Sequence, residues 1–205
     1  MSGRLRTVVL AALLLTQSHI AHAHIVSARL GDFYAGALHP LLTLQDVLVW
    51  MTLGLLAGSL GAASGRWLIV VFPLGLCAGL ALAATTSIAA LPPVVDAATI
   101  LLLGLLLAAS LRIPVALLCA IAFTLGVMRG TANAEELVAQ TDRLLYAAGL
   151  ACAGYVVITL VTAVALSFRR PDTEPTSSWR GITLRAVGGW VAAVGLMMAG
   201  LSFAT

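Results

Sequence analysis

Charge is scarce in this 205-residue chain, where only 9% of residues are charged, lysine is absent and all eleven cations are arginine. A water-soluble domain carries about 25% charged residues, so this chain has too few polar groups to cover a globular surface. Hydrophobic residues make up 61% of the chain, and its mean hydropathy is +1.07. The composition therefore excludes soluble, disordered and fibrous proteins and indicates an integral membrane protein.

Cysteine is also rare. Cys77, Cys119 and Cys152 fall in three different apolar runs, and no C-x-x-C pair occurs. This distribution excludes a disulfide framework and favours buried thiols that act as small apolar residues in helix packing. The formal net charge is +3, but no basic patch interleaved with aromatic residues accompanies it. The sequence therefore predicts no nucleic-acid partner.

The N-terminus has the features of a secretory signal. Two arginines precede a short apolar core at residues 7–15, and an A-x-A sequence ends at Ala23. This pattern predicts a signal peptide over residues 1–23, cleaved to leave His24 as the first residue, outside the cytoplasm. Residues 24–205 then form a single transmembrane domain. The alternative is that the segment stays attached as an anchor helix.

The rest of the chain contains six apolar runs, and a spanning helix needs about 20 such residues, with a range of about 17–25. No run alternates with the period of two that marks a half-buried strand. We therefore predict an all-α fold, an integral membrane bundle of six transmembrane helices. The runs are roughly Leu38–Leu60, Trp67–Ala84, Val94–Leu111, Ile113–Met128, Leu144–Phe168 and Ile182–Phe203.

The arginines predict the orientation of the bundle. If the mature N-terminus is outside, more arginines lie in cytoplasmic segments than in outer ones, as the positive-inside rule requires. The cytoplasmic set is Arg66, Arg112, Arg169, Arg170, Arg180 and Arg185, and the outer set is Arg29, Arg129 and Arg143. The polar stretch at about 169–181 is then a cytoplasmic loop. Both mature termini are periplasmic, in the inner membrane of a bacterium.

Asp46 is the one acid well inside a predicted span. It follows His39 by seven residues, which is close to two helical turns and about 10 Å. His39, Thr43 and Asp46 are therefore predicted to share one helix face. An acid in the membrane is costly and usually faces a partner or a water-filled path. Asp46 belongs either to a cation path or to a structural ion pair, and the sequence leaves both open.

A second polar set lies at the outer end of the fourth run. Arg129, Asn133 and Glu136 have i, i+4, i+7 spacing and share one face if the helix continues past the run. We predict that this face meets the face of Asp46. Arg129 is the natural partner for Asp46, because a guanidinium binds a carboxylate through two hydrogen bonds. The alternative is a solvated helix end.

The histidines are confined to the first 39 residues. After cleavage, His24 would offer its α-amine and a ring nitrogen to one metal ion, and the alternative is an ordinary solvated terminus. With His39, Asp46 and Glu136 it forms a set of imidazoles and carboxylates that suits nickel, cobalt, copper or zinc. The sequence offers no second intramembrane histidine for haem and no base for a serine hydrolase. We therefore expect no enzyme and no resident cofactor.

Two segments resemble the signature motifs of the HupE/UreJ family. In the first motif, H-P-x-x-G-x-D-H, the matching residues are His39, Pro40 and Asp46. Leu44–Gln45 and Val47 stand in place of its glycine and second histidine. These proteins are hydrogenase and urease accessory membrane proteins, regarded as nickel or cobalt permeases.

The second motif, similar to F-H-G-x-A-H-G-x-E, aligns with residues 128–136. Its matching residues are Gly130, Ala132 and Glu136. Arg129 and Asn133 stand where the family has histidines, so the resemblance implies a former metal site filled by a structural ion pair.

The resemblance covers nearly the whole mature chain and implies two functions. The first is a nickel or cobalt permease, with the transported ion as substrate, His24 at its entrance, and His39, Asp46 and Glu136 on its path. The second is a degenerate family member that does not transport. Such a protein would act as a structural or assembly partner of other membrane or metalloenzyme-maturation proteins.

Overall fold

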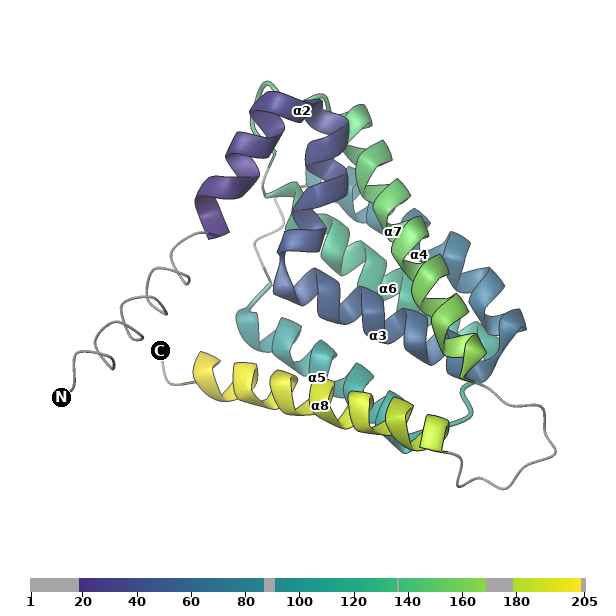
Figure 1. Cartoon of the computed structure of the whole chain (residues 1–205). Coiled ribbons are helices and arrows are strands. Elements are labelled where there is room, and N and C mark those ends of the chain that lie inside the picture. Colours follow the sequence, from purple (N-terminus) through teal and green to yellow (C-terminus); the bar gives the residue numbers. More distant parts are fainter. Residues whose placement is uncertain (1–18, 87–90, 136, 169–178, 204–205) are drawn as a thin grey trace, which may run out of the picture.

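The computed structural model describes residues 19–86, 91–135, 137–168 and 179–203 (Figure 1). This part of the chain holds seven helices and no strand, which confirms the all-α prediction. The helices are α2 (His19–Leu42), α3 (Leu44–Leu60), α4 (Ala62–Thr85), α5 (Pro93–Ala109), α6 (Val115–Ala134), α7 (Arg143–Ser167) and α8 (Trp179–Ser202).

Several of these helices are long and apolar enough to cross a membrane. Four of them, α4, α6, α7 and most of α8, meet that condition alone. A fifth candidate is the bent pair formed by Gly31–Leu42 and α3, while α5 is a shorter apolar helix of 17 residues. The chain is therefore a multi-pass membrane protein with four to five candidate spans by this measure.

The first predicted span is not one continuous helix, so the prediction of a single helix from Leu38 to Leu60 is wrong. Thr43 has extended backbone angles, and the chain bends by 81° between α2 and α3. Pro40 has no backbone N–H and disturbs the helix that precedes it. The hydroxyl of Thr43 donates to the carbonyl of His39 at 3.2 Å, the acceptor that a continuing helix would use for a backbone bond. His39, Thr43 and Asp46 therefore do not share one helix face.

Helices α4 and α6 lie in close contact and run in the same direction. Gly75 and Gly79 of α4 face Gly126 and Gly130 of α6, and a Cβ added to any of the four would collide with the facing backbone. Pairs of small residues four apart let membrane helices approach this closely. The glycine spacing visible in the sequence therefore marks a real helix–helix contact.

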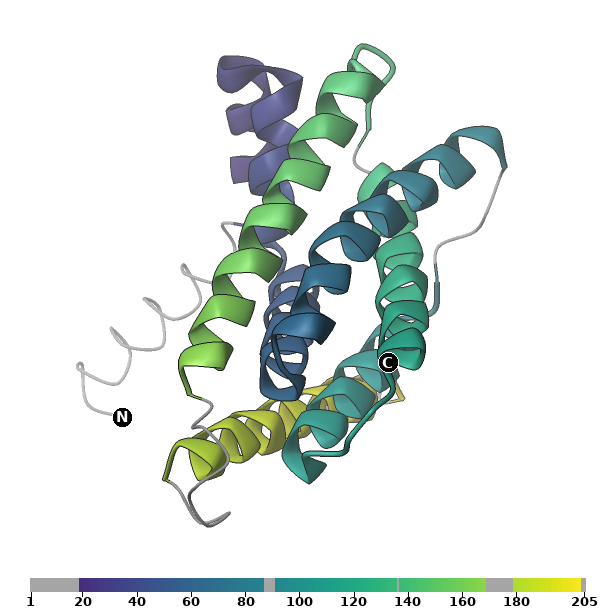
Figure 2. The same cartoon turned by 90° about the vertical axis from the view of Figure 1, so that its right-hand side faces the viewer.

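Helices α5 and α8 form a second close pair, which runs antiparallel. Gly104 lies against the backbone of Ala192, and Gly188 lies against that of Ala108. In Figure 2 this pair crosses beneath α4 and α7, which are inclined above it. The long contact with α8 supports α5, which has 17 residues and is as short as α3.

Helix α3 lies at the centre of the bundle and contacts α4, α5, α7 and α8. Trp50 is completely buried on it and packs edge-to-face on Phe72 of α4, with ring centroids 5.6 Å apart. Thr162 of α7 donates to the carbonyl of Gly54 at 3.3 Å. These contacts fix α3 in place and hold its N-terminal turn, with Asp46, inside the protein.

Candidate functional site

Asp46 lies in the first turn of α3 and is only 1% exposed. The break at Thr43 makes this turn a helix N-terminus, so the carboxylate lies at the positive end of the helix dipole. A continuous helix through this point would have given Asp46 no such environment. The bend after Pro40 therefore creates the electrostatic setting of the acid.

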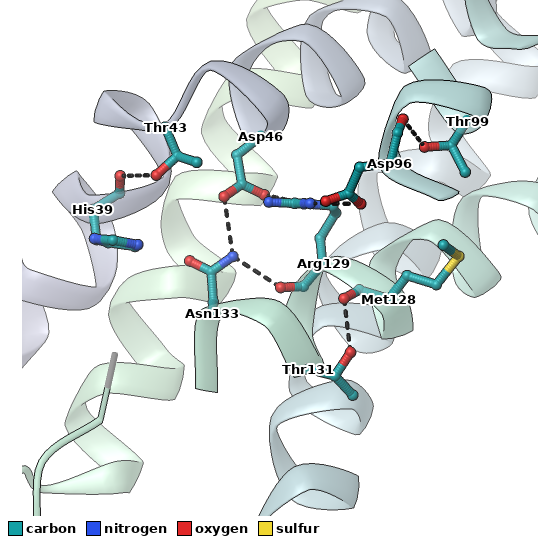
Figure 3. Close-up of polar contacts among 9 residues, drawn as sticks. All are labelled: His39, Thr43, Asp46, Asp96, Thr99, Met128, Arg129, Thr131 and Asn133. Carbon is teal, nitrogen blue, oxygen red and sulfur yellow. Dashed lines mark hydrogen bonds and ion pairs between the residues drawn. The ribbon is translucent and has the colours of Figure 1, made fainter. Parts of the chain in front are cut away.

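Arg129 joins Asp46 to a second acid (Figure 3). Its Nε donates to Oδ1 of Asp46 at 2.7 Å, and its Nη1 donates to Oδ1 of Asp96 at 3.1 Å. The ion pair with Asp46 is the one that the sequence favoured. The arginine extends from α6 toward the N-terminal turns of both α3 and α5, so one guanidinium connects three helices.

Asn133 completes this polar cluster, which we define as Asp46, Asp96, Arg129 and Asn133. Its Nδ2 donates to Oδ2 of Asp46 at 3.1 Å and to the carbonyl of Arg129 at 2.8 Å. Helix α6 continues to Ala134, so the predicted shared face of Arg129 and Asn133 is formed. Within the part of the chain that the structure describes, the buried Oδ1 of Asn133 has no hydrogen-bond partner.

Asp96 is the cluster residue that the sequence interpretation missed. It lies in the first turn of α5 with a side chain 25% exposed. Proline at the first helical position followed by an acid in the first turn is a helix-start signal. Pro93 and Asp96 have that pattern, so the sequence contains a signal that Asp96 lies at the start of a helix and at the end of a span.

Arg129 lies within the last turns of α6 and is 5% exposed, which agrees with the predicted pairing of its charge inside the bundle. A buried arginine is favourable only where its charge is paired, because removal from water is costly. The two carboxylates supply that pairing.

The other predicted metal residues do not join the cluster as ligands. The ring of His39 makes no hydrogen bond or ion pair within the described residues, and in Figure 3 it lies on the opposite side of Asp46 from Asp96. Glu136 and the side chain of His24 lie outside what the structure describes. Among the described residues, no three His, Cys, Asp or Glu side chains converge as a metal site.

The cluster has more anionic than cationic groups. Two carboxylates face one guanidinium, and both acids lie at helix N-termini that help to stabilise negative charge. Arginine has five N–H donors and no acceptor, so it cannot ligate a metal ion. The arrangement is a cation position between two acids that Arg129 itself fills.

Comparison with known proteins gives one family. The sequence profile described as HupE / UreJ protein matches residues 10–198. The match begins within the predicted signal segment, includes both motif regions and ends within α8. No curated protein and no solved structure gives a significant match.

Proposed function

Because the chain belongs to the HupE/UreJ family, we propose that it is a membrane permease for a divalent transition metal, nickel or cobalt. The ion is the substrate, and the protein needs no resident cofactor and performs no enzymatic reaction. Imidazole and carboxylate groups suit these metals. His24 stands at the entrance, and His39, Asp46 and Glu136 line the path.

The observation that carries the proposal is the polar cluster at the N-terminal ends of α3 and α5. Asp46 and Asp96 both contact Arg129, so the acids outnumber the cation. Oδ1 of Asn133 is a further buried acceptor without a donor among the described residues, and such an atom costs about 1–3 kcal/mol. A divalent cation beside Asp46 would satisfy this excess of acceptors.

Arg129 is then a tethered cation that competes with the metal. Its long side chain can leave the acids only if another positive charge replaces it, because unpaired buried carboxylates are strongly disfavoured. Exchange between guanidinium and metal would couple metal entry to a movement of Arg129 away from α3 and α5. The protein would be closed to the ion until that exchange occurs.

A separate observation favours the second function, that of a non-transporting accessory protein. The described residues contain no group of three metal-ligating side chains, and Arg129 holds both acids at hydrogen-bond distance. In this role the ion pairs of the cluster hold α3, α5 and α6 together and have no transport function. The protein would then support metalloenzyme maturation through contact with other proteins.

The membrane arrangement belongs to the same proposal. We propose six spans, α3 to α8, with α5 covering about 25 Å at 1.5 Å per residue against a hydrocarbon thickness of about 30 Å. The signal segment is cleaved after Ala23, and both mature termini are periplasmic in a bacterial inner membrane. N-terminal sequencing of the purified protein should then begin at His24, and a sequence that begins at Met1 would contradict cleavage.

Metal uptake by intact cells tests the two functions against each other. Cells with the protein should accumulate radioactive nickel or cobalt faster than cells without it. Asp46→Asn should remove the difference, while Glu135→Gln, an exposed acid at the end of α6, should retain it. Equal uptake with and without the protein, together with a loss of metalloenzyme activity in its absence, would instead support the accessory role.

A further inference from the structure

A cavity of about 930 Å³ lies at the end of the bundle opposite the polar cluster. It opens where α3 and α5 end and where α4 and α6 begin. Ser59 lies on α3 thirteen residues after Asp46, which corresponds to about 20 Å along the helix. The cavity is therefore separate from the proposed cation path and has the size of a small-ligand site, about 300–1,000 Å³.

The cavity walls combine an apolar surface with positive charge. Among the described residues that line the cavity, Arg112 is the charged one and none is acidic. The guanidinium is exposed and makes no hydrogen bond or ion pair with any described residue. The apolar part of the lining comes from Leu60, Leu107, Leu111, Ile113, Phe168 and Leu184.

Ser64 provides a second and independent indication of a ligand. It lines the cavity, is only 5% exposed, and its hydroxyl makes no hydrogen bond with any described residue. A serine in a helix can donate to a carbonyl one turn back, as Ser59 does to Leu56 at 2.7 Å. A buried hydroxyl that faces a cavity without such a bond is available to an acceptor within it.

Ser110 adds another available donor at the same place. It ends α5 in the left-handed conformation, with φ 53° and ψ 39°, and is the one non-glycine residue with positive φ among those described. Its hydroxyl makes no hydrogen bond with a described residue, and the first amides of α6 after Pro114 are free of intrahelical partners. Arg112, Ser64, Ser110 and the first amides of α6 thus supply several donors at the cavity, and such donors suit an anion.

We propose that this cavity binds the phosphate of an anionic phospholipid. Arg112 contacts the phosphate through its planar fork of N–H donors, Ser64 and Ser110 donate to its oxygens, and the apolar walls contact the start of the acyl chains. Inorganic phosphate shares the anionic chemistry but would leave those walls facing water. Cytoplasmic leaflets carry anionic lipids, which agrees with the predicted cytoplasmic side of this end.

The test is the thermal stability of the purified full-length protein in detergent, titrated with soluble short-chain lipids. Dioctanoyl-phosphatidylglycerol should raise Tm saturably, whereas dioctanoyl-phosphatidylcholine and inorganic phosphate should raise it much less. Arg112→Gln should weaken the apparent affinity at least about tenfold, because charge-assisted bonds are lost. Arg66→Gln, an exposed arginine of α4 that does not line the cavity, should bind like wild type.

Ser64→Ala keeps the test valid if Arg112→Gln misfolds. It should weaken lipid binding about three- to tenfold, as loss of one net hydrogen bond does, without lowering Tm in the absence of lipid. An equal shift with phosphatidylcholine would overturn the recognition of an anion, and an equal shift with inorganic phosphate would overturn the lipid assignment. Identical binding by the Arg112→Gln and Arg66→Gln variants would overturn the site.

Discussion

Arg129 and Asp46 are 83 positions apart in the sequence, yet Nε of Arg129 donates to Oδ1 of Asp46 at 2.7 Å inside the bundle. The side chain of Asp46 is 1% exposed and that of Arg129 is 6% exposed. A pair shielded from water in this way depends on both members, because Asp46 alone would lose its one ion pair and Arg129 alone would keep only its pair with the partly exposed Asp96. The first prediction concerns this dependence.

Asp46→Asn should destabilise the protein by about 3–5 kcal/mol, the range for a buried ion pair that loses one partner. Asp46→Asn combined with Arg129→Gln should be less destabilised than Asp46→Asn alone, because the buried pair is then absent and the charge that loses its partner is that of Asp96, whose side chain is 25% exposed and can be hydrated. Reversible unfolding of the purified protein in mixed detergent would measure both variants. Glu135→Gln is the matched control, and equal stability of the single and double variants would show that the pair is not coupled.

The parallel contact of α4 and α6 yields a second prediction. Gly79→Ala and Gly130→Ala each place a methyl group against backbone atoms of the other helix, so each should cost about 1–3 kcal/mol, as overpacking does. Gly189→Ala on α8 meets nothing within 4 Å and should leave stability unchanged or slightly higher. The decrease in Tm of each of the three variants, relative to wild type, tests this prediction. An equal loss for Gly189→Ala would mean that helix contact is not the cause.

The proposed topology yields a third prediction. With Cys77, Cys119 and Cys152 replaced by alanine, Ser177→Cys should resist a membrane-impermeant thiol reagent in intact cells, because its loop is cytoplasmic in the proposal. The same cysteine should react after the cells are permeabilised. A cysteine at Val138, between α6 and α7, should react from outside. The reverse pattern of labelling would invert the orientation.

The sequence predicted the helices well because hydrophobic length in a membrane protein is a local property. Five predicted runs correspond to α4, α5, α6, α7 and α8, and most of their ends lie within a few residues of the helix ends. The bend before α3 was missed because an apolar run looks the same whether it is straight or broken. Pro40 was the signal for the break, and Thr43 stabilises it through a bond to the His39 carbonyl.

The candidate site was predicted only in part, and the reason is the distance between its residues in the chain. Asp46 and Arg129 could be matched because each is an unusual charge near the same leaflet. Asp96 was not recognised as a site residue because it lies at the edge of an apolar run, where an acid at a helix start is ordinary. The orientation of His39 depends on the bend, which the spacing of residues along an ideal helix cannot predict.

The central claim is that Arg129 fills the position of a divalent cation between Asp46 and Asp96, and nickel binding to the purified protein tests it most directly. Arg129→Gln removes a competing positive charge, and a unit charge at 4 Å is worth about 4 kcal/mol at an effective dielectric constant of 20. Nickel should therefore bind Arg129→Gln at least about tenfold more tightly than wild type. Asp46→Asn in the same background should remove the gain. Equal nickel affinity of a folded, monodisperse Arg129→Gln variant and the wild type would contradict the account.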